Sequence, residues 1–224
     1  MLGGWVDYGQ AAYLRGRQVL GLDPETAREH DKVENFEAQV KQAKDEEKED
    51  CFRDLKDLDF SKVEVIHGRN VWLIHGARLP MAVLDRERVW RFMLLGWELG
   101  EPTIVLYVHT GASYHENCPG LTWMSEKLKS IPQVHKEKIQ KVLILHPDLH
   151  LWLCMQVLGS SMLQVLWSKT VFLMRVEYLW DTFEKGSIQL PPSVKEHDEY
   201  LEQNPLSDFY INGSSLIHTV QPQE

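Results

Sequence analysis

The clearest pattern in the chain is a series of short apolar runs that begins at Val63. Residues 63–67 and 71–76 are β-branched and aromatic runs separated by a short polar stretch that includes Gly68, which predicts two strands joined by a tight turn. Three later runs are apolar over nearly their whole length, as strands buried on both faces are, and they span residues 103–109, 140–145 and 171–174. The sequence therefore predicts five strands.

Helical periodicity separates these runs. Residues 85–99 repeat apolar side chains at Val89, Phe92 and Met93 with charged residues between them, and residues 121–131 predict another helix. Strands that alternate with helices form βαβ crossovers. The pattern therefore predicts an α/β sandwich with a mostly parallel five-stranded sheet that is flanked by helices on both sides.

The two ends of the chain have a different character. Residues 1–60 are interpreted as an N-terminal helical arm, because charges of both signs are dense from residue 25 to 59 and the apolar spacing at Phe36 and Val40 is thin, which is typical of a solvated helix. The main domain is expected to span residues 61–208, with a tail at 209–224. From Ile188 the sequence passes several prolines and loses periodicity, so this part is expected to wrap the surface without adding a layer.

Residues 149–167 contain no Asp, Glu, Lys or Arg. Their length approaches that of a membrane span, but His150, Gln156 and the absence of a flanking basic cluster argue against one. The alternative is two short helices broken at Gly159. Helices that are apolar nearly all round must be covered by protein, by a bound apolar ligand or by a membrane surface. The residues expected to face inward are Trp152, Met155, Leu158, Met162 and Leu166.

Charge and cysteine content narrow the environment. The formal net charge of −9 argues against a nucleic-acid partner and a polybasic membrane anchor, so any membrane contact must be apolar and local. The three cysteines are odd in number and widely spaced, which suits free thiols in a reducing compartment. The beginning of the sequence lacks an apolar signal segment, and we expect a cytoplasmic protein.

The sequence offers candidate residues for two kinds of chemistry, a metal site and a serine nucleophile. His109 and His146 each end a predicted parallel strand, where ligands gather in open α/β sheets, and a zinc site could recruit His115, Cys118 or His150. Their spacing fits no paired-ligand signature. The sequence around Ser113 faintly resembles a nucleophile elbow, but it lacks the second glycine of that motif. The sequence therefore predicts no metal, no cofactor and no catalytic residue.

Four segments carry a family resemblance: IVLYVHTGASYHENCPG at 104–120, VLILHPDL at 142–149, RVEYLWDTF at 175–183 and LPPSVKEHDEYL at 190–201. In this order they resemble the divergent CRAL-TRIO domain family, in particular the C-terminal domains of ganglioside-induced differentiation-associated protein 2-like proteins, and also BCH domains. The resemblance covers residues 61–208. It implies a sandwich with an apolar lipid cavity, in which residues 148–167 form a mobile gate.

Two non-enzymatic functions follow from the resemblance. The first is binding of a hydrophobic small molecule or phospholipid, with transient contact at a membrane surface for exchange. The second is a protein-interaction module with a vestigial cavity and a protein partner such as a small GTPase. The residues predicted to contact a lipid are Tyr107, His109, Leu145, Trp152, Met155, Leu158, Met162, Leu166 and Phe172.

Overall fold

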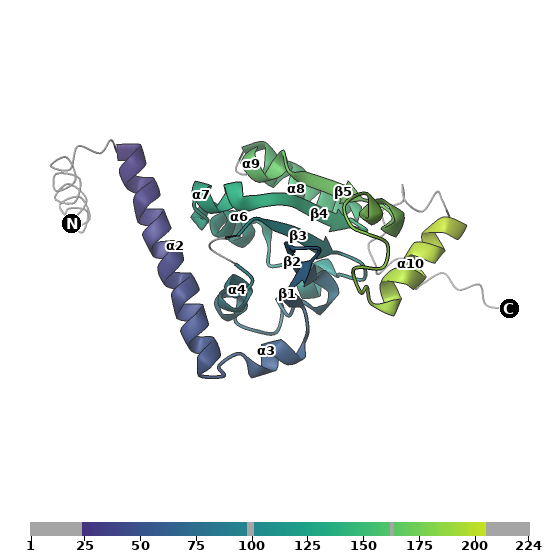
Figure 1. Cartoon of the computed structure of the whole chain (residues 1–224), viewed down its shortest axis with the longest axis horizontal. Coiled ribbons are helices and arrows are strands. Elements are labelled where there is room, and N and C mark those ends of the chain that lie inside the picture. Colours follow the sequence, from purple (N-terminus) through teal and green to yellow (C-terminus); the bar gives the residue numbers. More distant parts are fainter. Residues whose placement is uncertain (1–23, 98–100, 162–163, 205–224) are drawn as a thin grey trace.

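The structure is a computed structural model that describes residues 24–97, 101–161 and 164–204. Its centre is a five-stranded sheet whose strands lie side by side in the order in which they occur in the sequence (Figure 1). Strand β1 pairs with β2 in antiparallel fashion, and all other neighbours are parallel. The predicted α/β fold with a mostly parallel sheet is thus confirmed. The strands are β1 (Ser61–Ile66), β2 (Arg69–His75), β3 (Thr103–Val108), β4 (Ile139–Leu145) and β5 (Thr170–Leu173).

The hairpin that opens the sheet turns through two residues. His67 and Gly68 have φ angles of 49° and 74°. A two-residue turn with both central residues at positive φ matches the twist of the strands it joins, and glycine adopts that conformation without strain. The turn is shorter than expected, because Arg69 and Asn70 already belong to β2.

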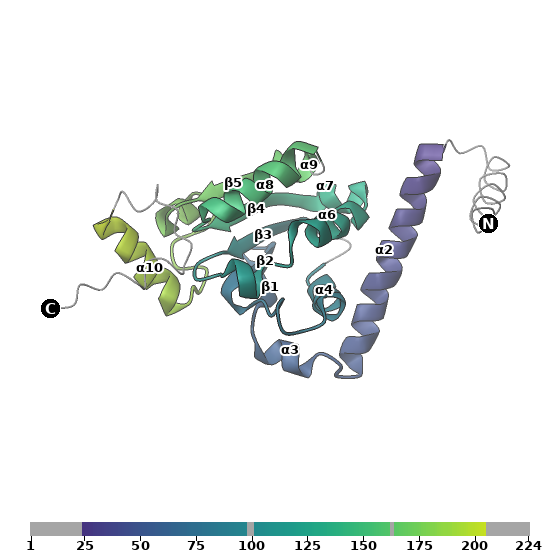
Figure 2. The same ribbon diagram turned by 180° about the vertical axis from the view of Figure 1, so that it is seen from behind.

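The helices that connect the parallel strands all cover the same face of the sheet. Each crossover advances by one strand in the same direction, and because such connections are right-handed, successive helices must lie on one side. Figure 2 shows several of them in front of the strands. These elements are α4 (Arg86–Leu94), α5 (Tyr114–Asn117), α6 (Leu121–Ser130), α7 (Gln133–Lys138), α8 (Leu149–Ser161) and α9 (Gln164–Trp167).

The opposite face of the sheet is covered by the segment that follows β5. This segment contains the 3₁₀ helix η2 (Val176–Asp181) and helix α10 (Pro192–Gln203). The prediction that residues after Ile188 add no layer was therefore wrong. Proline occupies the first position of α10, and its apolar stripe consists of Val194 and Leu201, which is too sparse to stand out in the sequence. The side chains that cover this face include Leu179, Phe183, Ile188, Leu190 and Val194.

The helical arm is not simply solvated. Helix α2 (Pro24–Lys48) is followed by α3 (Arg53–Asp57), which confirms its helical character. Phe36, Val40 and Ala43 form a stripe along α2 that is buried in the same core cluster as residues of the sheet. The three positions are spaced i, i+4 and i+7, so they form one apolar stripe that packs this highly charged helix against the domain.

The expected break at Gly159 does not occur, because α8 continues through this residue to Ser161. A side-chain carbon at Gly159 would lie 2.4 and 2.5 Å from ring atoms of Trp167. The glycine therefore permits the close approach of Trp167 from helix α9 rather than ending a helix. Among the described residues, no helix combines the length and apolarity needed to cross a bilayer.

Replacing Gly159 by alanine should lower the free energy of unfolding by about 1–2 kcal/mol, because the steric clash with Trp167 exceeds the gain in helix propensity of about 1 kcal/mol. Urea denaturation followed by far-UV circular dichroism measures the change. In a Trp167→Leu background the same alanine should be neutral or stabilising. A Gly159→Ala variant more stable than the original chain would contradict the packing described above.

Candidate functional site

A cavity of about 270 Å³ lies between the sheet and the crossover helices that cover one of its faces. It is roughly twice the size of the ~150 Å³ protein cavity that holds benzene and just below the ~300 Å³ lower end of small-molecule pockets. Its wall is almost entirely apolar. The site can therefore enclose a compact apolar molecule.

Strand alternation supplies the floor of the cavity. Trp72, Val105 and Val142 are neighbours across β2, β3 and β4, and Ile74, Tyr107 and Ile144 form the next row. All six line the cavity. Because side chains alternate between the two faces of a strand, the residues between these rows point into the core on the other face.

Four of the residues predicted to contact a lipid lie on the cavity wall: Tyr107, His109, Met155 and Leu166. Tyr107 and His109 come from the end of β3, Met155 from α8 and Leu166 from α9. The structure thus brings together residues from three separate parts of the chain. Their contact with a lipid remains a prediction.

The other predicted residues do not line the cavity. Leu145 is opposite Val108 in the sheet register and is fully buried on the other face, and Leu158 is buried within the core of the helical side. Trp152 is 41% exposed on the outer side of α8. The ring of Phe172 packs 6.0 Å from that of Trp167. Met162 lies outside the described residues.

Sequence reasoning missed much of the aromatic wall. Among the described residues, five tryptophans line the cavity, namely Trp72, Trp90, Trp97, Trp123 and Trp167, and none of them is among the residues predicted above to contact a lipid. Trp72 could have been found from its alternation with Ile74 on β2, and Trp90 shares one face of α4 with Met93. Trp97 and Trp123 complete the set.

One end of the cavity is polar. Asp148 lies immediately before α8, where its Oδ1 accepts a hydrogen bond of 2.6 Å from the Leu151 N–H. His109 Nε2 lies 3.2 Å from the same oxygen, at ion-pair distance, but is not aligned for a hydrogen bond. The hydroxyl of Tyr107 is 3.3 Å from His109 Nδ1. A carboxylate, an imidazole and a phenol thus meet at the carboxyl end of β3.

The protonation of this end follows from its surroundings. Burial raises the pKa of Tyr107, so the phenol stays neutral. Burial also acts to raise the pKa of Asp148, but the contacts with His109 and the Leu151 N–H outweigh it and hold that pKa below its ordinary value. Asp148 is therefore ionised at neutral pH.

A second polar group lies nearby on the wall. His150 Nε2 is 3.4 Å from Cys154 Sγ, and its ring packs against Tyr114 with 4.1 Å between centroids. Burial raises the pKa of the Cys154 thiol, which keeps it protonated at neutral pH. This arrangement does not activate the cysteine as a nucleophile.

His146, the histidine that follows β4, has a structural role. His146 lies 2.8 Å from Thr110 Oγ1 and 3.1 Å from Asp198 Oδ1, and thereby joins β4 to α10. Its φ of 52° breaks the alternation of β4. Within the described residues, no group of three converging metal-ligand atoms combines the histidines and cysteine weighed for zinc.

Ser113 immediately precedes the short helix α5, and its N–H donates to Asn117 Oδ1 at 2.8 Å. In the part of the chain that the structure describes, no hydrogen bond joins its hydroxyl to a histidine. Asn117 in turn donates to the carbonyls of Ala77 and Leu79. The Ser113 loop is therefore organised as a structural turn.

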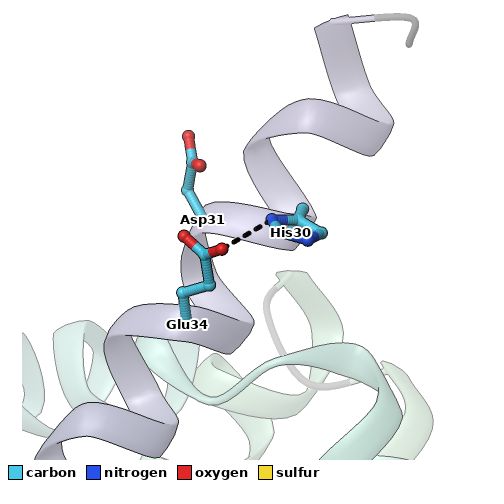
Figure 3. A group of neighbouring side chains, drawn as sticks. All are labelled: His30, Asp31 and Glu34. Atoms are coloured by element: carbon cyan, nitrogen blue, oxygen red, sulfur yellow. Dashed lines mark ion pairs between the residues drawn. The ribbon is translucent and has the colours of Figure 1, made fainter. Parts of the chain in front are cut away.

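One group of converging side chains lies on the arm. His30, Asp31 and Glu34 project from α2, with His30 Nδ1 3.4 Å from Glu34 Oε1 (Figure 3). The side chains of His30 and Glu34 are more than half exposed. Exposed groups at this helical spacing commonly form surface ion pairs, and we assign the cluster no binding role.

Comparison with known proteins matches residues 68–200, more than half of the chain, to the family described as Divergent CRAL/TRIO domain. Two curated relatives, Protein GDAP2 homolog of Drosophila melanogaster and Protein GDAP2 homolog of Drosophila pseudoobscura pseudoobscura, are each 24% identical to the chain over 136 residues. The aligned part covers 58% of this chain and 24% of each relative. The chain thus matches about a quarter of the length of these curated relatives.

Proposed function

Because the chain belongs to the divergent CRAL/TRIO domain family, whose members are generally binding domains, we propose that it is a non-catalytic domain that holds a small hydrophobic molecule, such as a lipid, between its sheet and helices. The observation that carries the proposal is the apolar cavity of about 270 Å³. Without a bound apolar molecule, the apolar side chains of this wall lack packing partners, which is unfavourable. A bound apolar molecule would supply those partners.

Helix α8 supports an exchange of this molecule at a membrane surface. Met155 and Cys154 on its inner side line the cavity, whereas Leu149, Trp152, Leu153 and Val157 on its outer side are exposed. The outer residues are spaced i, i+3, i+4 and i+8, so they form one apolar stripe. A helix with a ligand on one side and an apolar stripe on the other could open while its outer side rests on lipid.

A cavity-filling variant tests the proposal. Val142 lies on the floor, and Val142→Phe should reduce binding by at least about tenfold, because the larger ring occupies ligand volume. Val171→Phe is the matched control, since Val171 is an exposed strand residue that does not line the cavity. Native mass spectrometry of the purified chain detects a bound apolar molecule. Titration with Nile red, read from tryptophan fluorescence, measures binding to the cavity.

We expect an apolar molecule in the original chain and in Val171→Phe, and its loss in Val142→Phe. A chain that carries no such molecule and does not bind Nile red would contradict lipid binding.

The second candidate is a protein-interaction module with a partner such as a small GTPase, and the exposed stripe on α8 favours it. This function would depend on the outer side of the helix and not on the cavity. Binding of a protein partner should then survive Val142→Phe and be lost in Trp152→Ser. Loss of partner binding in the filled variant alone would argue against it.

A further inference from the structure

We propose that the cavity selects apolar molecules that carry a hydroxyl group, and that Asp148 accepts the hydrogen bond from this hydroxyl. The inference rests on the proposed function and names the chemistry of the ligand. It is argued from the polar end of the cavity, where Asp148 stands beside His109 and Tyr107.

One oxygen of the Asp148 carboxylate is available to accept a hydrogen bond from a ligand. Both of its contacts described above, with the Leu151 N–H and with His109, fall on Oδ1. The second oxygen remains as an acceptor, and the side chain, which lines the cavity, retains 23% of its exposure. A carboxylate at the end of an apolar cavity strongly favours a hydrogen-bond donor in any ligand that reaches it.

The charge at this end disfavours an acidic head group. A ligand with an ionised carboxylate or phosphate would bring a second negative charge close to the ionised Asp148. Like charges repel strongly in an apolar cavity. Lys127 is the one lysine or arginine found on the cavity wall within the described residues, and it already pairs with Glu87. Its Nζ also lies over the rings of Trp123 and Trp90, 5.6 and 5.8 Å from their centroids.

A hydroxyl satisfies the site at the lowest desolvation cost. It can donate to Asp148 while remaining uncharged, whereas an ammonium group must lose the hydration of a full charge before it enters the cavity. The Tyr107 and His109 rings fix the shape of this end, because the Tyr107 hydroxyl contacts one nitrogen of His109 and the carboxylate of Asp148 lies beside the other. The remaining wall is apolar and suits the body of an alcohol.

Three probes of equal chain length test the inference: dodecanol, its methyl ether, and dodecanoic acid at about pH 8, where the acid is ionised. Binding is read from the fluorescence of the tryptophans that line the cavity. We expect dodecanol to bind at least about tenfold more tightly than the ether, which cannot donate, because a hydrogen bond to a charged group is that strong. The affinity for dodecanol should also exceed that for dodecanoate by at least the same factor.

Asp148→Asn should reduce both preferences to within about threefold. Asparagine still caps helix α8, so the fold should survive. The matched control is Asp85→Asn, because Asp85 caps α4 through the Glu87 N–H and does not line the cavity. This variant should keep the preferences of the original chain.

The outcomes separate the two proposals. If none of the probes binds to the original chain, the proposed function fails. If the alcohol, ether and acid bind equally, the hydroxyl inference is overturned while the cavity function stands. A preference for the alcohol that persists in Asp148→Asn would also overturn it. If that variant fails to fold, as judged by circular dichroism, the comparison of the three probes on the original chain decides alone.

Discussion

Replacing Phe36 by alanine should lower the free energy of unfolding by about 3–5 kcal/mol, the range for loss of a buried aromatic side chain. Phe36 is 1% exposed although it lies on a helix of mostly charged residues. Its ring meets that of Trp97 edge to face at 5.3 Å and lies 5.0 Å from that of His135. Alanine would leave a cavity between α2 and the domain.

Urea denaturation measures this loss, and Asn35→Ala is the control. Asn35 is exposed one position before Phe36 on the same helix, so its replacement should change stability by less than about 0.5 kcal/mol. Equal, small effects of both substitutions would mean that α2 does not share the core of the domain.

Acidification should destabilise the fold through His146 by about 3 kcal/mol. Burial lowers the pKa of His146 from 6.5 to about 4, although the hydrogen bond with Asp198 acts to raise it. Its side chain is only 1% exposed, so the shift is not weakened by solvent. The unfolded chain therefore takes up a proton at a pH where the folded chain does not, and stability falls as the pH drops from about 6.5 to about 4.

The pH dependence of the urea midpoint tests this expectation. His146→Gln should be less stable at neutral pH but should lose less stability on acidification, whereas His115→Gln, on the exposed side of α5, should retain the full dependence. Burial also lowers the pKa values of His75 and His135, so part of the dependence should remain in His146→Gln. An unchanged acid response of that variant would refute the role of His146.

Most of the sheet was predictable because β2 to β5 each contain a compact apolar run. Residues 103–109 were expected to form a strand, and β3 covers Thr103–Val108. The segment that covers the second face of the sheet was not predictable in the same way. Val194 and Leu201 are the buried apolar residues of α10, and Val194 packs on a sheet face that only the tertiary fold creates.

The cavity was only partly predictable for a related reason. Strands buried on both faces contain apolar residues at every position, so the sequence does not reveal which of two neighbours faces the ligand side. Leu145 was chosen on β4, but its neighbour Ile144 lies on the floor. Helix α8 presented the same difficulty, because Trp152 and Met155 are both apolar and only Met155 lines the cavity.

The one-sided placement of the crossover helices has a consequence for how the domain can be divided. The ligand-side core is completed by α2, near one end of the described chain, and the opposite core is closed by α10, near the other. A recombinant fragment trimmed to the family match at residues 68–200 would lack α2 and strand β1. Such a fragment would leave the apolar surfaces beneath them open to water, so useful expression boundaries lie outside both flanking helices.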